Sequence, residues 1–450
     1  MRAIVLASTA LVLSMPAYAY DPVKDTRAIL AATVTTKSIQ TEYLTGKRDG
    51  TTLFKRVQAA YTAIRTAEAA VTPAPTPASG YVPALSLAGG APLNATFPVE
   101  QGLQKSWGTG AIPLFYGRAP GQPDNWQPDE GAFRFTCGGD GPLKSDDPLL
   151  YPNQPGKSHL HKFWGTMAID ANSTPASLAQ QTNSNCNTGT KTLNRSGYWM
   201  PALIDDQAMV RNPDLVSVYY KRPRSISKFC LEGSPVRMAA KGCAGLPNSI
   251  RFIFGWDPTK PDLPAQGMSW YCTAGTGKHV TNLDDLFGNE GCVAGATMVA
   301  DLMAGNCWNG TNLDTPDHRA HVVLGGYGDW GFYRCPVSHP YLIPQTQNKV
   351  MWTVTADMIG TRADGSKFSR VKLSSDHMKA GAKPGETMHA DYMEQWVAAA
   401  KQMWIDNCIE KGLDCTGGDL GNGLQLIGAQ QPTYGWTIPA DKARVAIPGS

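Results

Sequence analysis

Most histidines of this chain gather in four short segments, and two of these segments also contain aspartates. Six of the eight histidines fall in them, and the first segment holds a His-x-His pair. On a β-strand, residues two apart face the same side, so His159 and His161 are expected to project together. Two adjacent imidazoles suit metal ligation or acid–base catalysis. The alternative is a partly exposed polar face of a strand.

A second group of polar residues lies within the segment 306–340. Asp314, Asp317, His318 and His321 fall within eight residues. An aspartate beside a histidine can orient the ring and select its tautomer, as catalytic and metal-ligating histidines require. The alternative is a turn in which the aspartates cap backbone amides. We expect both histidines of this segment to converge on one point.

The remaining two segments lie later in the chain. His339 follows Cys335 in a Cys-Pro-Val-Ser-His-Pro sequence, where a disulfide could hold it. His389 and Asp391 stand at the start of an apolar pattern of helical period over residues 391–405. This predicts Asp391 as an N-cap and His389 at a helix N-terminus, which favours a neutral ring.

The elements that must position these residues are mainly β. Short β-branched and aromatic runs alternate with Gly, Pro, Asn and Asp clusters over residues 91–427, which predicts a sandwich or jelly-roll-like core with long loops. We expect a helical N-terminal extension at 20–72, a Pro-rich linker at 73–90, the C-terminal helix at 391–405 docked on the sheet, and an irregular tail at 428–450.

The first 19 residues have the pattern of a signal peptide. Arg2 precedes an apolar run that ends at Leu13, and Ala17-Tyr18-Ala19 is a small-residue cleavage site. No run is long enough to span a bilayer. The formal net charge of +3 is too small to indicate a nucleic-acid partner. The chain is expected to be secreted or periplasmic after cleavage near Ala19.

The cysteines support an oxidising compartment. Their even number, ten, predicts five disulfides in an exported protein. No Cys-x-x-Cys pair indicates a zinc ribbon or a redox site. Proximity favours Cys230–Cys243, Cys272–Cys292 and Cys408–Cys415. Cys307 and Cys335 are expected to staple the histidine-rich segment that they enclose.

Five motifs together resemble the DUF1996 family, a family of secreted proteins defined only as a domain of unknown function. They are SHLHKFWG (158–165), SGYWMPAL (196–203), NCWNGTNLDTPDHRAH (306–321), CPVSHPYLIPQ (335–345) and MHADYMEQW (388–396). The resemblance covers roughly residues 130–416. Its fungal members often carry WSC carbohydrate-binding modules, which implies a polysaccharide or cell-wall setting. Departures at Val337, Met388 and Tyr392 leave the polar positions intact.

The function that we expect is a polysaccharide hydrolase or lyase. A glycosidase needs two carboxylates and a lyase needs a base beside a neutralised carboxylate. The expected catalytic residues are His159, His161, Asp317, His318, His321, His389 and Asp391. Trp164, Trp308 and Trp330 are expected to stack on sugars. The alternatives are a divalent-metal site at His159, His161 and His321, and a non-catalytic glycan-binding or envelope protein.

Overall fold

The computed structural model describes most of the chain beyond residue 130. The described residues are 81–82, 93, 98–106, 111–113, 130–186, 192–234, 236–327, 333–428 and 438–448. They belong to one compact unit, Ala78–Ser450. The predicted signal peptide and helical extension lie outside the described residues, as does Trp330.

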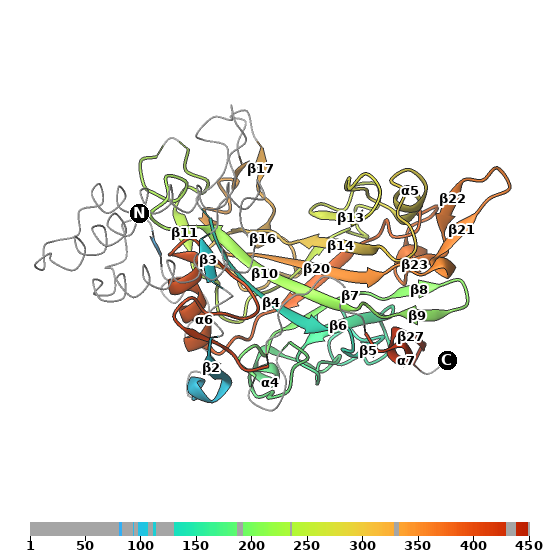
Figure 1. Cartoon of the computed structure of the whole chain (residues 1–450). Coiled ribbons are helices and arrows are strands. Elements are labelled where there is room, and N and C mark those ends of the chain that lie inside the picture. Colours follow the sequence, from blue (N-terminus) through green and yellow to red (C-terminus); the bar gives the residue numbers. More distant parts are fainter. Residues whose placement is uncertain are drawn as a thin grey trace, which may run out of the picture. The chain divides into compact units, whose positions relative to one another are not determined.

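A long sheet of seven strands forms one layer of the fold (Figure 1). Its order is β13 (Met268–Cys272), β14 (Thr297–Met303), β20 (Gln345–Thr353), β10 (Leu215–Pro223), β4 (Glu130–Gly138), β25 (Leu413–Cys415) and β3 (Ala111–Pro113). The central strands alternate apolar and polar residues. In β4, for example, Phe133 and Phe135 are fully buried in the core while Arg134 between them is half-buried. This alternation directs one face of the sheet into the core.

A second sheet of five strands carries the histidine motifs. Its order is β12 (Arg251–Gly255), β24 (His389–Met393), β7 (Gly197–Pro201), β6 (His161–Gly165) and β5 (Leu143–Lys144). One face of this sheet, which includes Tyr198 and Tyr392, packs in the main core. The other face, which includes Phe163 and Trp199, packs in a separate apolar cluster with Leu149. Both faces are covered, so these strands are buried almost throughout.

Hydrogen bonds between tyrosine hydroxyls join the two sheets inside the core. The Tyr220 hydroxyl on β10 lies 2.5 Å from that of Tyr198 on β7 and 3.0 Å from that of Tyr392 on β24. The pairing satisfies three buried polar groups between the layers. A sandwich-like, mainly β fold is therefore confirmed.

Smaller elements surround the two sheets. A third sheet has the order β1 (Tyr81–Val82), β11 (Gly242–Ala244), β19 (Tyr341–Leu342), β15 (Cys307–Trp308) and β16 (Val322–Val323). A fourth has the order β23 (Val371–Leu373), β8 (Leu203–Asp205), β9 (Met209–Arg211) and β27 (Arg444–Ala446). Three pairs complete the strands: β17 (Gly326–Tyr327) with β18 (Tyr333–Arg334), β2 (Leu103–Lys105) with β26 (Leu424–Leu426), and β21 (Ile359–Thr361) with β22 (Lys367–Ser369).

The helices are short. The α-helices are α4 (Pro175–Ala179), α5 (Leu283–Gly288), α6 (Ala398–Trp404) and α7 (Ala440–Ala443); a π-helical turn, η5 (Ile405–Ile409), continues α6, and the 3-10 turns are η2 (Val99–Gly102), η3 (Ala356–Met358) and η4 (Asp376–Met378). Among the described residues, no helix has the length and apolar character needed to cross a membrane.

Four sequence predictions differ from this structure. The helix predicted over 391–405 begins only at Ala398, because residues 389–393 pair with β7 and β12 as strand β24. His389 therefore does not lie at a helix N-terminus, and Asp391 is not an N-cap. The later part does dock on the sheet, where Trp404 stacks on Phe133 of β4 at 5.5 Å. In the tail predicted as irregular, the described residues 438–448 include α7 and β27.

All ten cysteines are paired. The three bridges favoured by proximity are present, and Cys307–Cys335 closes the histidine-rich segment. The fifth bridge, Cys137–Cys186, spans 49 residues, which is why proximity did not suggest it. The prediction of five disulfides is confirmed.

Candidate metal centre

Three histidines from two distant parts of the sequence converge on one face of the sheet β12-β24-β7-β6-β5. His159 and His161 lie just before and at the start of β6, and His389 begins β24. One ring nitrogen of each can be chosen so that all three atoms lie within 4.8 Å of one another. The ring centroids of His159 and His161 are 4.2 Å apart, and those of His159 and His389 are 5.1 Å apart. Three of the residues that we expected in the site, His159, His161 and His389, therefore lie together.

Strand periodicity explains why these rings meet. His161 shares its face of β6 with Phe163, and His389 shares its face of β24 with Asp391, since residues two apart in a strand face the same side. Phe163 and Asp391 both pair with Trp199 of β7. The two histidines therefore flank β7 on the face that is turned away from the main core.

Backbone carbonyl groups select the tautomer of two of the rings. Nδ1 of His161 lies 2.9 Å from the Asp146 carbonyl oxygen, and Nδ1 of His389 lies 2.9 Å from that of Thr387. A carbonyl oxygen can only accept, so each Nδ1 carries the proton and each Nε2 keeps its lone pair. This is the arrangement that metal-ligating histidines adopt.

Two of the Nε2 atoms have no protein partner. Nε2 of His159 and Nε2 of His161 are buried and make no hydrogen bond within the described part of the chain. A buried nitrogen without a partner costs roughly 1–3 kcal/mol, so such atoms are rare unless a ligand or water satisfies them. Together with the grouping of one ring nitrogen from each histidine within 4.8 Å, these unpartnered atoms indicate a site for a cation.

Burial keeps these rings neutral. Desolvation, reinforced by the charge of His161, lowers the pKa of His389 to about 3. Desolvation also lowers the pKa of His161, although nearby Asp147 opposes the shift. The pKa of His159 falls well below its ordinary value for the same reason, with His161 and His389 adding to the effect. Neutral imidazole is the form that binds metals.

Two carboxylates lie beside the histidines. Asp391 is buried, and neither of its side-chain oxygens has a hydrogen-bond partner among the described residues. Burial, and next the charge of Asp147, raise the pKa of Asp391 well above its usual value. Asp147 is also buried, and its Oδ1 accepts hydrogen bonds from the amides of Leu149 and Leu150, each 2.9 Å long. Asp391 is therefore the carboxylate with free acceptors.

The other predicted histidines form a separate, structural group. Nε2 of His321 donates to the Arg251 carbonyl at 2.9 Å, and its Nδ1 lies 2.9 Å from the Thr315 hydroxyl. Nε2 of His339 donates to the Ala320 carbonyl at 2.8 Å. With their ring nitrogens engaged in this way, these histidines brace the segment. His389, not His321, completes the set with His159 and His161.

His318 and Asp317 also shape this segment. His318 adopts a left-handed backbone with φ of 53°, and its Nδ1 lies 2.7 Å from Oδ1 of Asp314. Oδ1 of Asp317 accepts hydrogen bonds from the amides of Arg319 and Ala320 and from the Thr315 hydroxyl. Asp317 thus caps a turn, which was the alternative considered for this segment.

The predicted substrate-binding tryptophans are in the core. Trp164 is fully buried and stacks on Tyr198 at 6.2 Å. Trp308 is fully buried, and its Nε1 donates to the Asn312 carbonyl at 2.7 Å. Neither ring can stack on a sugar, because no face of it reaches solvent. Trp330 lies outside the described residues.

Sequence reasoning missed two charged neighbours of the histidines, Asp147 and Arg319. Asp147 stands in an Asp-Asp-Pro sequence twelve residues before His159, and Arg319 stands in the Asp-His-Arg-Ala-His motif itself. The available signal was the adjacency of charged residues to the histidine motifs. That signal does not reveal which of them face the site.

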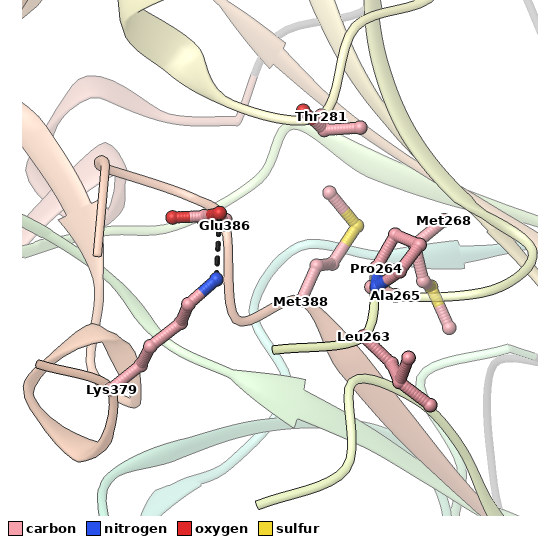
Figure 2. Close-up of a pocket in the computed structure, with 8 residues that line it drawn as sticks. All are labelled: Leu263, Pro264, Ala265, Met268, Thr281, Lys379, Glu386 and Met388. Carbon is pink, nitrogen blue, oxygen red and sulfur yellow. Dashed lines mark hydrogen bonds and ion pairs between the residues drawn. The ribbon is translucent and has the colours of Figure 1, made fainter. Parts of the chain in front are cut away.

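A pocket lies close in sequence to His389 but has different chemistry (Figure 2). Its lining is Leu263, Pro264, Ala265, Met268, Thr281, Lys379, Glu386 and Met388. Its charged groups, Lys379 and Glu386, pair with each other at 2.7 Å. None of the residues that we predicted for the site lines this pocket. The histidine cluster is therefore the stronger candidate.

Comparison with known proteins gave one match. A family model described as a domain of unknown function, DUF1996, matches residues 147–396. This range includes the three converging histidines, Asp147, Arg319 and Asp391. No curated protein and no solved structure matched the chain.

Proposed function

The protein belongs to the DUF1996 family, and we propose that it is an exported, metal-dependent enzyme acting on extracellular polysaccharide at His159, His161 and His389. The observation that carries the proposal is the convergence of three neutral imidazoles. Two of them present an Nε2 lone pair because their Nδ1 protons are held by backbone carbonyl groups. This preorganisation resembles a metal site more than the packing of a core.

The donor set suggests the class of metal. Three imidazole nitrogens suit Zn²⁺ and other late first-row divalent ions, and they leave a coordination position open. A divalent ion in such a site polarises substrate oxygens and lowers the pKa of bound water. Asp391, two residues after His389 on the same face of the strand, is buried, and both of its oxygens lack a partner among the described residues, so they could accept hydrogen bonds from a water held at the ion.

Other features of the chain support an extracellular location and a polysaccharide substrate. Five disulfides support an oxidising compartment, in agreement with the signal-peptide pattern of the first 19 residues. The association of family members with carbohydrate-binding modules favours a polysaccharide substrate. Cleavage by water and cleavage by elimination are both compatible with this site.

The metal is tested on purified, mature protein. Elemental analysis and titration calorimetry with Zn²⁺ should give one ion per chain, and His161→Ala and His389→Ala should each lower the affinity by at least about tenfold. His279→Ala is the matched control, because His279 is exposed and its Nδ1 lies 2.7 Å from the Ser269 hydroxyl in another part of the fold. Absence of stoichiometric metal at neutral pH would contradict the proposal of a metal centre.

The reaction is tested on a panel of neutral and acidic polysaccharides. New reducing ends report hydrolysis, and ultraviolet absorbance of unsaturated products reports elimination. We expect turnover that chelation abolishes and that added metal restores. Metal binding without turnover of any polymer would instead favour a non-catalytic glycan-binding or envelope protein.

A further inference from the structure

Arg319 is fixed beside His389. Its Nη2 donates to the Trp256 carbonyl at 2.9 Å and its Nη1 to the Gly255 carbonyl at 3.4 Å. Gly255 is the residue of β12 that pairs with His389 of β24. The guanidinium group therefore stands at the end of β12, next to the proposed metal centre, and its charge contributes to the lowered pKa of His389.

The position next to His389 is built for close approach. Gly255 has φ of 93°, and a Cβ added to it would lie 2.8 Å from the Cα atom of His389. Only glycine tolerates both the backbone conformation and the contact. The carbonyl group that anchors Arg319 is thereby held against the strand that carries His389.

Arg319 is also short of partners. The carboxylates whose charge reaches it are those of Asp391, Asp257 and Asp317, and none of them makes an ion pair with it among the described residues. Burial lowers the pKa of Arg319 in spite of these charges. A guanidinium group has five N–H donors, and only two are used by the carbonyl groups. The remaining donors are available to a ligand.

Arg319 presents its unused donors in a partly buried position. Asp257 and Asp317, whose charge reaches it, accept hydrogen bonds from their own loops. Asp391 is buried, and its pKa is raised well above the usual value. Hydrogen bonds from a guanidinium group to a carboxylate are charge-assisted and gain strength where solvent is partly excluded. An anionic group of a ligand would satisfy the donors that remain.

We propose that the substrate is an acidic polysaccharide and that Arg319 binds the carboxylate of a uronate residue beside the metal. The inference rests on the proposed function and names the substrate class of the same site. Arginine suits this role because its planar fork matches a carboxylate with two parallel hydrogen bonds. A carboxylate held in this way would lie beside His389, one of the three residues that would hold the ion.

The test compares one polymer in two forms. Zinc-loaded protein is titrated with a polyuronate and with the same polymer after chemical reduction of its carboxyl groups. We expect the acidic form to bind at least about tenfold more tightly, which corresponds to one charged hydrogen-bonded pair. Arg319→Gln should remove that preference, and Arg319→Lys should retain only part of it because it keeps the charge and loses the fork.

Zinc content is measured on every variant. Unchanged zinc content in Arg319→Gln, with loss of the acidic preference, supports the inference. Arg370→Gln is the matched control, because Arg370 is partly exposed and pairs with Asp206 at 2.7 Å. Equal binding of both polymer forms by the wild-type protein would overturn the substrate class and leave the metal centre standing. Absence of zinc from the wild-type protein would instead overturn the proposed function.

Discussion

The buried imidazoles should make the metal-free protein sensitive to acid. The pKa of His389 falls from 6.5 to about 3 on folding, so below pH 6.5 the unfolded chain binds a proton that the folded chain does not. The free energy of unfolding should therefore fall between about pH 6.5 and pH 3, by up to about 1.4 kcal/mol per pH unit for each such histidine. Above pH 6.5 this contribution is fully present.

Urea unfolding at pH 7.5 and pH 5, after a chelator has removed the metal, measures this decrease in the free energy of unfolding. His389→Gln keeps a polar side chain that cannot be protonated in this range, so its stability should depend less steeply on pH. An unchanged pH dependence in this variant would mean that His389 is not held neutral in the folded protein.

At the scale of residues, sequence reasoning found the histidines better than their neighbours. The two-residue period of His159 and His161 predicted their convergence, because strand geometry alone determines it. His321 stands beside aspartates as a ligand would, yet the Arg251 carbonyl, 70 residues away in sequence, takes its Nε2. Such a contact depends on tertiary packing, and no local pattern reveals it.

At the scale of elements, the loop before β24 should control the metal affinity. The Asp376 carboxylate accepts hydrogen bonds from the amides of Leu373, Gly385 and Thr387 at 2.8, 2.7 and 3.2 Å, and from the Thr387 hydroxyl at 2.8 Å. The Thr387 carbonyl in turn holds Nδ1 of His389. Asp376→Asn should cost about 2 kcal/mol of stability and roughly tenfold in zinc affinity.

Chemical unfolding and zinc titration measure the two effects separately. Asp364→Asn is the control, because Asp364 is exposed and accepts hydrogen bonds from Ser366 within the turn between β21 and β22. A loss of stability in Asp376→Asn without a loss of zinc affinity would show that the loop does not position His389.

The misassigned start of the C-terminal helix has a physical reason. Residues 391–404 contain a helical apolar pattern, and Trp396 and Trp404 are indeed buried together in the core. Residues 389–393 also alternate between two faces, with His389 and Asp391 on one and Tyr392 on the other. Pairing with β7 and β12, which are distant in sequence, decides in favour of the strand.

At the scale of the whole molecule, composition predicted the fold class but not the order of the strands. Runs such as FRFTC and SIRFIF, set between turn residues, indicated a β-rich sandwich. The seven-stranded sheet places β10 between β20 and β4, and these pairings join residues that are 77 to 136 positions apart. Local sequence patterns do not determine such pairings, because each strand could pair with several others.

Removing the Cys307–Cys335 disulfide should affect Arg319 and the three histidines of the proposed metal centre differently. The disulfide closes a loop of 28 residues that carries Arg319, whereas His159, His161 and His389 lie outside that loop. Replacing both cysteines with serine should cost roughly 3–4 kcal/mol through the greater entropy of the unfolded chain. The preference for acidic polymer should fall, because Arg319 is less firmly held, while the zinc content should stay at one ion per chain.

The serine pair at Cys408 and Cys415 is the matched control, since that bridge spans only 7 residues next to α6 and η5. It should cost less stability and leave both the zinc content and the acidic preference intact. If the Cys307–Cys335 variant lost zinc in parallel with the preference, the loop and the histidines would form one cooperative unit. If it kept both, the hydrogen bonds from Arg251 and Ile253 to the loop would suffice to hold Arg319 in place.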